Sequence, residues 1–205
     1  MDVRAPGIAA VDLSDSQPIS HGRGHRHYER FSVRLTQEDG HSLSLERDVL
    51  RCGKVVGALT IDPGRNQVVL TRQFRLGAYL AAAEHETLEI VAGRLDPGED
   101  TMETARRECR EEIGLELHRL VPLLELMPAP AWADEWMTLF LARVDAALAP
   151  DRAGAADEQE NIVVVRCSVD EALGLISKRL VHSAPTIIAL QWLALNRSSV
   201  ATLLT

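Results

Sequence analysis

The alternation of polar and apolar side chains predicts a chain built largely of strands. Residues 30–37 and 41–52 alternate as half-buried strands do, and the link Glu38–Gly40 between them is typical of a hairpin. Two runs rich in β-branched residues, 55–61 and 67–74, flank the turn sequence Asp-Pro-Gly-Arg-Asn. Similar short runs predict further strands at residues 87–93, 120–126, 136–144 and 162–167.

One helix is predicted in the middle of the chain, over residues 101–113. Asp100 lies three residues before Glu103, as in an N-terminal capping pair, and Gly114 is a natural C-terminal stop. An apolar stripe on this helix would pack against a sheet, and its members are Met102, Ala105, Cys109 and Ile113. The simplest interpretation of Cys109 is therefore a core residue and not a catalytic thiol.

Two further helical patterns lie near the C-terminus, at residues 170–179 and 184–197, and Pro185 suits the start of the second. Residues 78–86 form a connection with no clear period, and residues 1–25 look like a loose arm.

Composition and charge limit the classes of function. The chain of 205 residues is 46% hydrophobic and 25% charged, as in an ordinary globular protein. Its net charge of −8 argues against a nucleic-acid-binding surface, and no apolar run is long enough for a membrane span. The three cysteines are widely spaced and odd in number, and no secretory signal begins the sequence, so we expect reduced thiols in a cytoplasmic protein.

Three histidines gather near the predicted first hairpin, at His21, His25 and His27. Their spacing matches no standard ligand set, so a solvated polar turn is favoured over a metal site.

The predicted central helix carries a cluster of acidic residues. Glu108, Glu111 and Glu112 project to one side, and each like-charge pair costs roughly 0.2–0.5 kcal/mol in an isolated helix. Arg107 relieves part of this repulsion. Two interpretations remain for the carboxylates alone: a solvated acidic face with local ion pairs, or a site for a hard divalent cation such as Mg²⁺.

The spacing of the whole segment supports the second interpretation, because it resembles the Nudix box. The matching positions are Gly93, Glu99, Arg107-Glu108, Glu111-Glu112, Gly114 and Leu115, and Cys109 stands where that pattern usually has an aliphatic residue. The resemblance implies an α/β fold, the Nudix α/β/α sandwich with a mixed sheet. It also implies that Glu108 and Glu112 are the leading metal ligands, with Glu111 close behind and the Ala92 carbonyl adding an oxygen. Arg107 would orient these carboxylates.

Motifs outside the box are similar to those of bacterial ADP-ribose pyrophosphatases. They include "LEIVAG" before the box, "RQFR" on the preceding strand, "DEQENIVVV" after it, and Pro130 sixteen residues beyond Gly114. The resemblance implies hydrolysis of ADP-ribose to AMP and ribose 5-phosphate with Mg²⁺, for which Mn²⁺ is a possible substitute. It also implies a homodimer in which residues 1–50 form an N-terminal arm with dimer contacts and residues 51–205 form the Nudix domain.

The same resemblance distributes roles among the polar residues. Since the box carboxylates are occupied by metal, the general base should come from the acidic loop, where Glu158 is favoured over Glu160. Arg75 would grip a phosphate, with Arg47 as a weaker candidate. Glu89 would contact either metal or ribose. Pro130 is assigned to the substrate site, and the candidates for stacking on adenine are Tyr28, Phe31 and Trp132.

Two other functions stay open at this point. One keeps the chemistry but changes the sugar, as in a GDP-mannose hydrolase. The other is a nucleotide-sensing module without catalysis, which the complete set of box carboxylates disfavours.

Overall fold

The computed structural model describes residues 8–18, 27–82, 86–155 and 160–205, with only the backbone described at residues 8, 9 and 14–18. The chain divides into two compact units. The first combines Met1–Gly53 with Ala129–Glu135, and the second combines Lys54–Pro128 with Trp136–Thr205.

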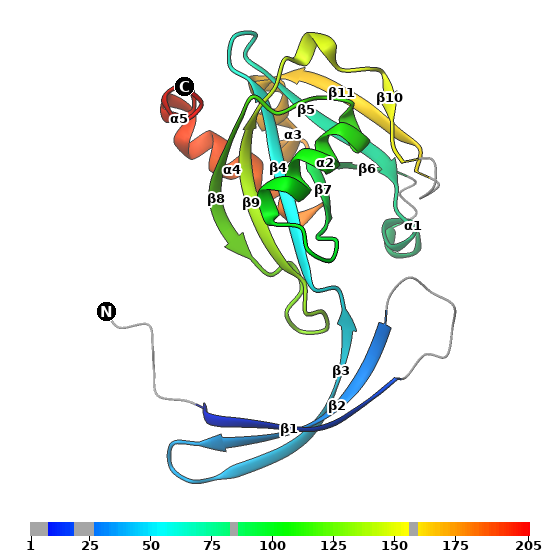
Figure 1. Ribbon diagram of the computed structural model, residues 1–205, viewed down its shortest axis with the longest axis vertical. Helices are drawn as coiled ribbons and strands as arrows, with labels where there is room; N and C mark the ends of the chain where they lie inside the picture. The colour runs from blue at the N-terminus through cyan, green and yellow to red at the C-terminus, as the bar shows by residue number, and fades with distance from the viewer. Residues whose placement is uncertain (1–7, 19–26, 83–85, 156–159) are drawn as a thin grey trace. The chain divides into compact units, whose positions relative to one another are not determined.

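The first unit contains an antiparallel sheet of three strands, β1 (Ile8–Pro18), β2 (His27–Gln37) and β3 (Ser42–Arg51) (Figure 1). The predicted hairpin is confirmed, and its turn contains Gly40 with a φ of 85°. The prediction of a loose arm over residues 1–25 is wrong for β1, which pairs along the length of β2. Pairing with a distant strand supplies order that the local pattern does not indicate.

One face of this sheet is lined with apolar side chains. The cross-strand register aligns Val11, Leu35 and Leu43 in one row and Leu13, Val33 and Leu45 in the next. Directly paired residues share a face of an antiparallel sheet, so the six side chains form one surface. Leu13 is 64% exposed and Leu43 is 51% exposed, so this surface is poorly covered within the unit.

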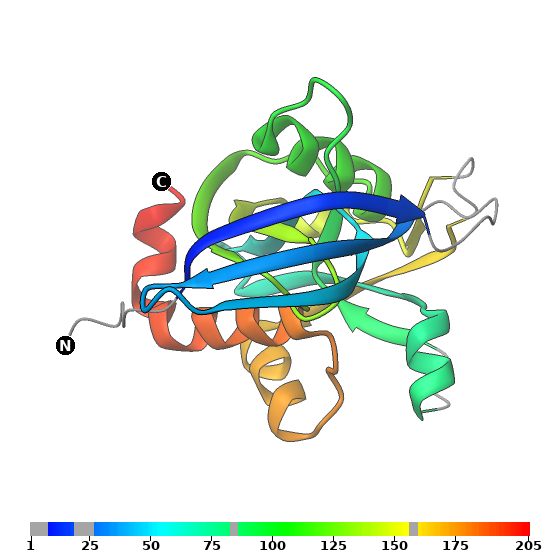
Figure 2. The same cartoon turned by 90° about the horizontal axis from the view of Figure 1, so that it is seen from below.

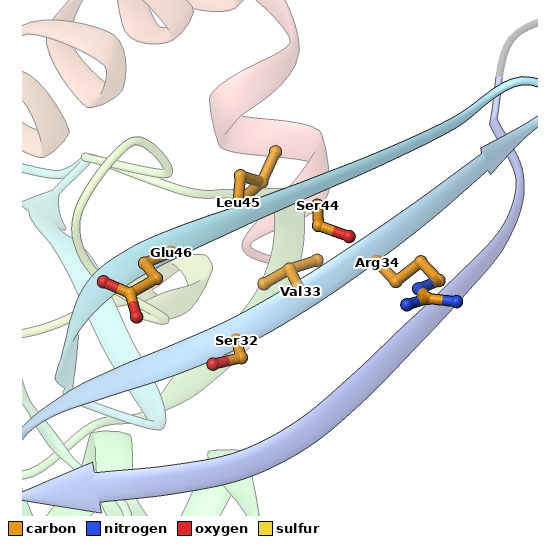
Figure 3. A pocket seen from close by; sticks show the side chains of 6 residues that line it. All are labelled: Ser32, Val33, Arg34, Ser44, Leu45 and Glu46. Atoms are coloured by element: carbon orange, nitrogen blue, oxygen red, sulfur yellow. The ribbon is translucent and has the colours of Figure 1, made fainter.

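A hollow of about 420 Å³ also lies on the β2–β3 hairpin (Figure 3). It is lined by Ser32, Val33 and Arg34 from β2 and by Ser44, Leu45 and Glu46 from β3. The aromatic candidates for adenine binding are not among these lining residues.

The segment 129–135 is fastened to the end of β3 through Asp134. Its carboxylate accepts hydrogen bonds from the amides of Cys52 and Gly53, and it pairs with the Arg51 guanidinium at 2.6 Å. Together with the backbone hydrogen bonds that Leu50 makes with Trp132 and Asp134, this side chain holds Pro130 and Trp132 in the same unit as the predicted arm.

The second unit is built around a mixed sheet of eight strands. Its central strand β4 (Lys54–Asp62) pairs in parallel with β9 (Trp136–Arg143), and every other pairing in this sheet is antiparallel. Eight of the nine residues of β4 are buried, and only Lys54 is exposed, as expected of a strand covered on both faces. The remaining strands are β5 (Gln67–Phe74), β6 (Glu86–Glu89), β7 (Val91–Arg94), β8 (Arg119–Leu126), β10 (Arg152–Ala153) and β11 (Ile162–Ser168).

A split between β4 and β5 shapes the region of the Nudix-like segment. The two strands pair only beside their connecting turn, at residues 60–62 and 67–69. Farther along, β5 pairs with β6 while β4 pairs with β7. The single strand predicted at residues 87–93 is therefore two short strands, and the change of partner separates Glu89 from Ala92 across the split.

Helices cover both faces of this sheet. Helix α2 (Thr101–Ile113) lies on one face, and α3 (Val169–Ser177) and α4 (Ala184–Asn196) lie on the other (Figures 1 and 2). This arrangement confirms the α/β/α sandwich. The shorter helices are α1 (Leu76–Ala82), α5 (Val200–Leu203), η1 (Ala146–Leu148) and η2 (Arg197–Ser199). Among the helices that the structure describes, none is long and apolar enough to cross a membrane.

Helix α2 has the bounds and caps that the sequence predicts. The Asp100 side chain accepts hydrogen bonds from the amides of Met102 and Glu103, and the Glu103 carboxylate accepts one from the Asp100 amide. Gly114 ends the helix at a φ of 67°. Cys109 is fully buried, which confirms it as a core residue. Met102 is 43% exposed, so the prediction that it lies on the buried stripe is wrong. Thr104 is the buried residue of the first turn instead, and its hydroxyl donates to Glu99 and to the Asp100 carbonyl.

Candidate functional site

The site forms where the N-terminal loop and one face of α2 meet β7. A Cβ atom added at Gly93 would overlap the carboxylate of Glu108, so the helix side chain lies directly against the strand backbone. Only glycine permits this approach, which is the physical reason for glycine at the first position of the motif. On the next turn, the Ala92 amide donates to Glu112 Oε2 at 3.0 Å.

Arg107 organises the remaining carboxylates. Its Nη1 donates to Glu108 Oε1 and to Glu111 Oε2, both at 2.8 Å, and its Nε donates to Glu99 Oε1 at 3.0 Å. Nη2 bonds the Arg94 carbonyl at 2.9 Å, which ties the side chain to β7. Arg107 thus contacts three carboxylates of the segment, and its role in orienting them for a metal stays a prediction.

Glu99 is a site residue whose contacts sequence reasoning missed, although its fixed place in the motif was a signal. The hydrogen bond from Arg107 lowers the pKa of Glu99 to about 2, although partial burial opposes the shift. The Arg107 guanidinium, whose pKa is raised chiefly by Glu99, therefore stays charged and in place.

The carboxylates outnumber the nearby positive charges. Glu108 is 9% exposed and Glu112 is 2% exposed, and burying an ionised carboxylate is costly without full compensation. Burial raises the pKa of Glu112 well above its ordinary range; the Ala92 amide opposes the shift and the Glu108 charge adds to it. A site of buried anionic oxygens with too little positive charge has the donor chemistry that hard divalent cations prefer.

The side chains as placed are paired with protein groups and do not converge on one point. Within the described part of the chain, no three His, Cys, Asp or Glu side chains are close enough together to hold one ion. The reason is visible in the contacts: Arg107 draws Glu108 and Glu111, and the Ala92 amide holds Glu112. Chelation by these residues would require their carboxylates to turn away from those partners.

Arg75 and Glu89 form a second cluster beside the first. Arg75 Nη2 donates to Glu89 Oε2 at 2.6 Å, and Thr87, two residues earlier on the same face of β6, also bonds Glu89. Burial acts to lower the pKa of Arg75, but the Glu89 hydrogen bond and the charges of Glu89, Glu112 and Glu160 outweigh it, so the pKa is raised. The field of the box carboxylates therefore reaches Arg75.

The acidic loop is anchored to the helix at its start. The Gly154 amide donates to the Glu111 carbonyl at 2.8 Å, and the Glu160 carboxylate accepts from the Ala155 amide at 3.3 Å. The charge of Glu160 also acts on Glu112, which brings it into the electrostatic environment of the site. Glu158 lies outside the described residues.

The remaining predicted site residues belong to the first unit. Arg47 on β3 pairs across the sheet with Phe31, and its Nη1 bonds the Glu46 carbonyl. Phe31 in turn has the Arg51 guanidinium 5.6 Å from its ring centre. Pro130 and Trp132 are exposed on the segment fastened by Asp134. His27 begins β2 and is exposed, while His21 and His25 lie outside the described residues.

Comparison with known proteins agrees with this geometry. The NUDIX domain family model matches residues 53–191, and this chain therefore belongs to the Nudix family. The ADP-ribose pyrophosphatase of Escherichia coli (strain K12) is 35% identical over 158 residues, which cover 77% of this chain and 76% of that protein. The GDP-mannose pyrophosphatase of Cronobacter sakazakii is 30% identical over 163 residues, covering 79% of this chain and 84% of that protein.

A solved structure described as an ADP compounds hydrolase has the same fold. Its TM-score is 0.69, covering 93% of this chain and 97% of that one, at 23% sequence identity. At that identity the likeness establishes the fold alone, and it confirms the fold class predicted from the box.

Proposed function

We propose that this protein hydrolyses the diphosphate bridge of ADP-ribose with Mg²⁺, releasing AMP and ribose 5-phosphate. The protein is a Nudix hydrolase of the pyrophosphatase type. The observation that carries the proposal is the buried pair Glu108 and Glu112 beside Gly93, where carboxylates are held out of water with too little positive charge around them.

The residues present fit a divalent cation. Glu108, Glu111 and Glu112, with the Ala92 carbonyl, would hold it, and Mn²⁺ offers the same preference for oxygen ligands. When bound, the cation neutralises charge on the diphosphate and lowers the pKa of a coordinated water. Arg107 keeps the carboxylates on the face of α2 that meets β7.

The other groups of the site act on the substrate and on water. Arg75 binds a phosphoryl oxygen through its planar guanidinium, which Glu89 orients. A carboxylate of the acidic loop takes the proton of the attacking water, whose oxygen bonds to phosphorus as the bridging P–O bond breaks. Glu158 is the favoured base and Glu160 the second candidate; the anchoring of this loop to α2 supports either assignment.

By the family resemblance, the strands of the first unit help to form the nucleoside pocket of a partner chain in the predicted homodimer. Phe31 and Arg47 are cross-strand neighbours, which supports a site where a base stacks on the ring and Arg47 meets a phosphate. Pro130, Tyr28 and Trp132 are further candidates for this half of the substrate.

The test is a substrate panel with purified protein and Mg²⁺, comparing ADP-ribose with GDP-mannose, NADH and diadenosine polyphosphates. We expect the highest kcat/KM for ADP-ribose, with AMP and ribose 5-phosphate as products. A preference for GDP-mannose, which the Cronobacter relative makes the leading alternative, would overturn the substrate assignment. Binding of these compounds without turnover of any would instead indicate a sensing module.

A further inference from the structure

The peptide group that joins Glu89 to Ile90 lies where the chain changes strand partners at the split in the mixed sheet. Residues 86–89 pair with β5 and residues 91–94 pair with β4, so Ile90 belongs to neither register. Ile90 is buried, and a buried amide outside a strand ladder needs a hydrogen-bond acceptor from elsewhere. The change of partner therefore creates a hydrogen-bonding requirement inside the core of the second unit.

Two threonine hydroxyls bond this peptide group. The Ile90 amide donates to Thr186 Oγ1 of α4 at 2.9 Å. The Glu89 carbonyl of the same peptide accepts from Thr71 Oγ1 of β5 at 3.3 Å. Both threonines are fully buried, so the two bonds are shielded from water. A helix and a strand that are distant in the sequence thus hold the two polar groups of one peptide.

The side chain of Ile90 is fixed on the face of the sheet that carries α4. It belongs to the core cluster that includes Leu190 of that helix. A Cβ atom added at Gly57 would lie 2.9 Å from Ile90 Cδ1, so this glycine of β4 leaves the room that the isoleucine fills. The next residue, Val91, packs instead in the cluster that includes Cys109 of α2. The chain is therefore held on both faces of the sheet at the split.

The residues on either side of this peptide contribute to the proposed site. Glu89 carries the carbonyl of the peptide and holds Arg75 through its carboxylate. Ala92 and Gly93, which follow Ile90 closely on β7, contact the two buried carboxylates of α2. Successive residues of a strand alternate in direction, so a shift of one residue at the split would turn Glu89 away from Arg75.

We infer that Thr186 is a positioning residue for the proposed hydrolysis. By accepting the hydrogen bond of the Ile90 amide, it fixes where the chain passes from β5 to β4, and so places Glu89 and the strand backbone at Gly93. Thr186 acts through the backbone from α4, on the opposite face of the sheet from α2 (Figures 1 and 2). The inference rests on the proposed function, in which these groups act on a nucleoside diphosphate sugar.

The decisive variant is Thr186→Val, which removes the hydroxyl and keeps the branched shape of the side chain. We expect kcat/KM for ADP-ribose to fall by roughly 10- to 100-fold, because small misplacements of the groups around a substrate are costly. Thr186→Ser keeps the acceptor and should restore kcat/KM to within about threefold of the wild type. Failure of serine to rescue the activity would show that the hydroxyl is not the group that matters.

Thr60→Val is the matched control. Thr60 is also fully buried in this sheet, and its hydroxyl donates to the Val69 carbonyl at 2.6 Å, beside the turn between β4 and β5. Its removal should lower the free energy of unfolding, as Thr186→Val does, but leave kcat/KM within about threefold of the wild type. Equal kcat/KM values in the two valine variants would overturn the inference, because the Thr186 hydroxyl would then contribute stability alone.

Amide signals in NMR spectra test the geometry without any substrate. In Thr186→Val, the Ile90 amide should exchange its hydrogen at least about tenfold faster relative to other core amides, and the amide signals of Ala92 and Gly93 should shift. In Thr60→Val these signals should keep their wild-type positions. If Thr186→Val does not fold, Thr71→Val removes the other hydroxyl from the same peptide and should give the same shifts.

The outcomes separate this inference from the proposed function. If the wild-type protein cleaves ADP-ribose and Thr186→Val is equally active, the function stands and the inference is wrong. If the wild-type protein cleaves no nucleotide sugar, the proposed function fails and the amide signals decide. Shifts at Ala92 and Gly93 that are confined to Thr186→Val would then keep Thr186 as the residue that positions this strand, and unchanged signals would overturn that role.

Discussion

At the scale of single residues, the site depends on one close approach of backbone and side chain. Glu108 lies against Gly93, in space that any Cβ atom would occupy, and Glu112 is bonded to the preceding amide of Ala92. The strand backbone at Ala92 and Gly93 thereby fixes the positions of two buried carboxylates of the helix. The acidic cluster that looks unfavourable in the sequence is arranged around this contact.

Gly93→Ala should therefore displace the Glu108 carboxylate and lower kcat/KM by at least about 100-fold, because a 1 Å misplacement alone can cost that much. The control is Gly174→Ala in α3, where an added Cβ meets no atom within 4 Å. We expect that variant to keep full activity and to gain up to about 1 kcal/mol in free energy of unfolding, since alanine is the better helix former. Equal activity in both variants would show that the approach of Glu108 to the strand is not needed.

At the scale of elements, α2 and its preceding loop are joined through Arg107, Glu99 and the Asp100 capping box. Much of this could be predicted from the sequence, because caps, helical period and motif spacing are local. The division of residues 86–94 into β6 and β7 could not, since it depends on β4 and β5 parting. Helix α1 is only seven residues long, which is too short for a clear period, and β1 is ordered by its pairing with β2.

The Glu99–Arg107 pair should make stability depend on acidity. Because the folded pKa of Glu99 is lowered from 4.5 to about 2, its contribution to stability is complete above the unfolded pKa and is lost as pH falls through the folded value. Denaturant titrations between pH 6 and about pH 2 should show the free energy of unfolding falling less steeply in Glu99→Gln than in the wild type. Glu116→Gln, at an exposed position after the helix, serves as the control. The same slope in wild type and Glu99→Gln would contradict the assigned pairing.

The acidic loop between β10 and β11 should supply the general base. Glu158→Gln is expected to lower kcat by about 10²–10⁴-fold with little change in KM, because it removes proton transfer and not substrate binding. Glu160→Gln should have a smaller effect. An unchanged rate in Glu158→Gln together with a large loss in Glu160→Gln would move the role to Glu160, and unchanged rates in both would remove the base from this loop.

At the scale of the whole molecule, the predicted homodimer should use the apolar face of the first unit. Val11, Leu13 and Leu43 in these rows are each more than half exposed, and an uncovered apolar sheet face tends to acquire a partner. Sedimentation equilibrium should show a dimer, and Leu43→Asp should raise its dissociation constant by about tenfold or more, because a charge would be buried. Leu148→Asp, at a 71% exposed position of the second unit, is the control. A monomeric wild type, or a dimer unaffected by Leu43→Asp, would count against this surface.

The central claim concerns the whole site: buried carboxylates on α2 bind a divalent cation together with a diphosphate. Isothermal calorimetry with Mn²⁺ or Mg²⁺, in the presence of a non-hydrolysable methylene analogue of ADP-ribose, measures this directly. We predict saturable binding in the wild type. Mutating a residue that only supports a metal ligand typically lowers metal affinity by roughly 10–100-fold, and we predict a larger loss in Glu112→Gln, with the fold retained. The absence of saturable metal binding in the wild type, or unaltered binding in Glu112→Gln, would contradict the account.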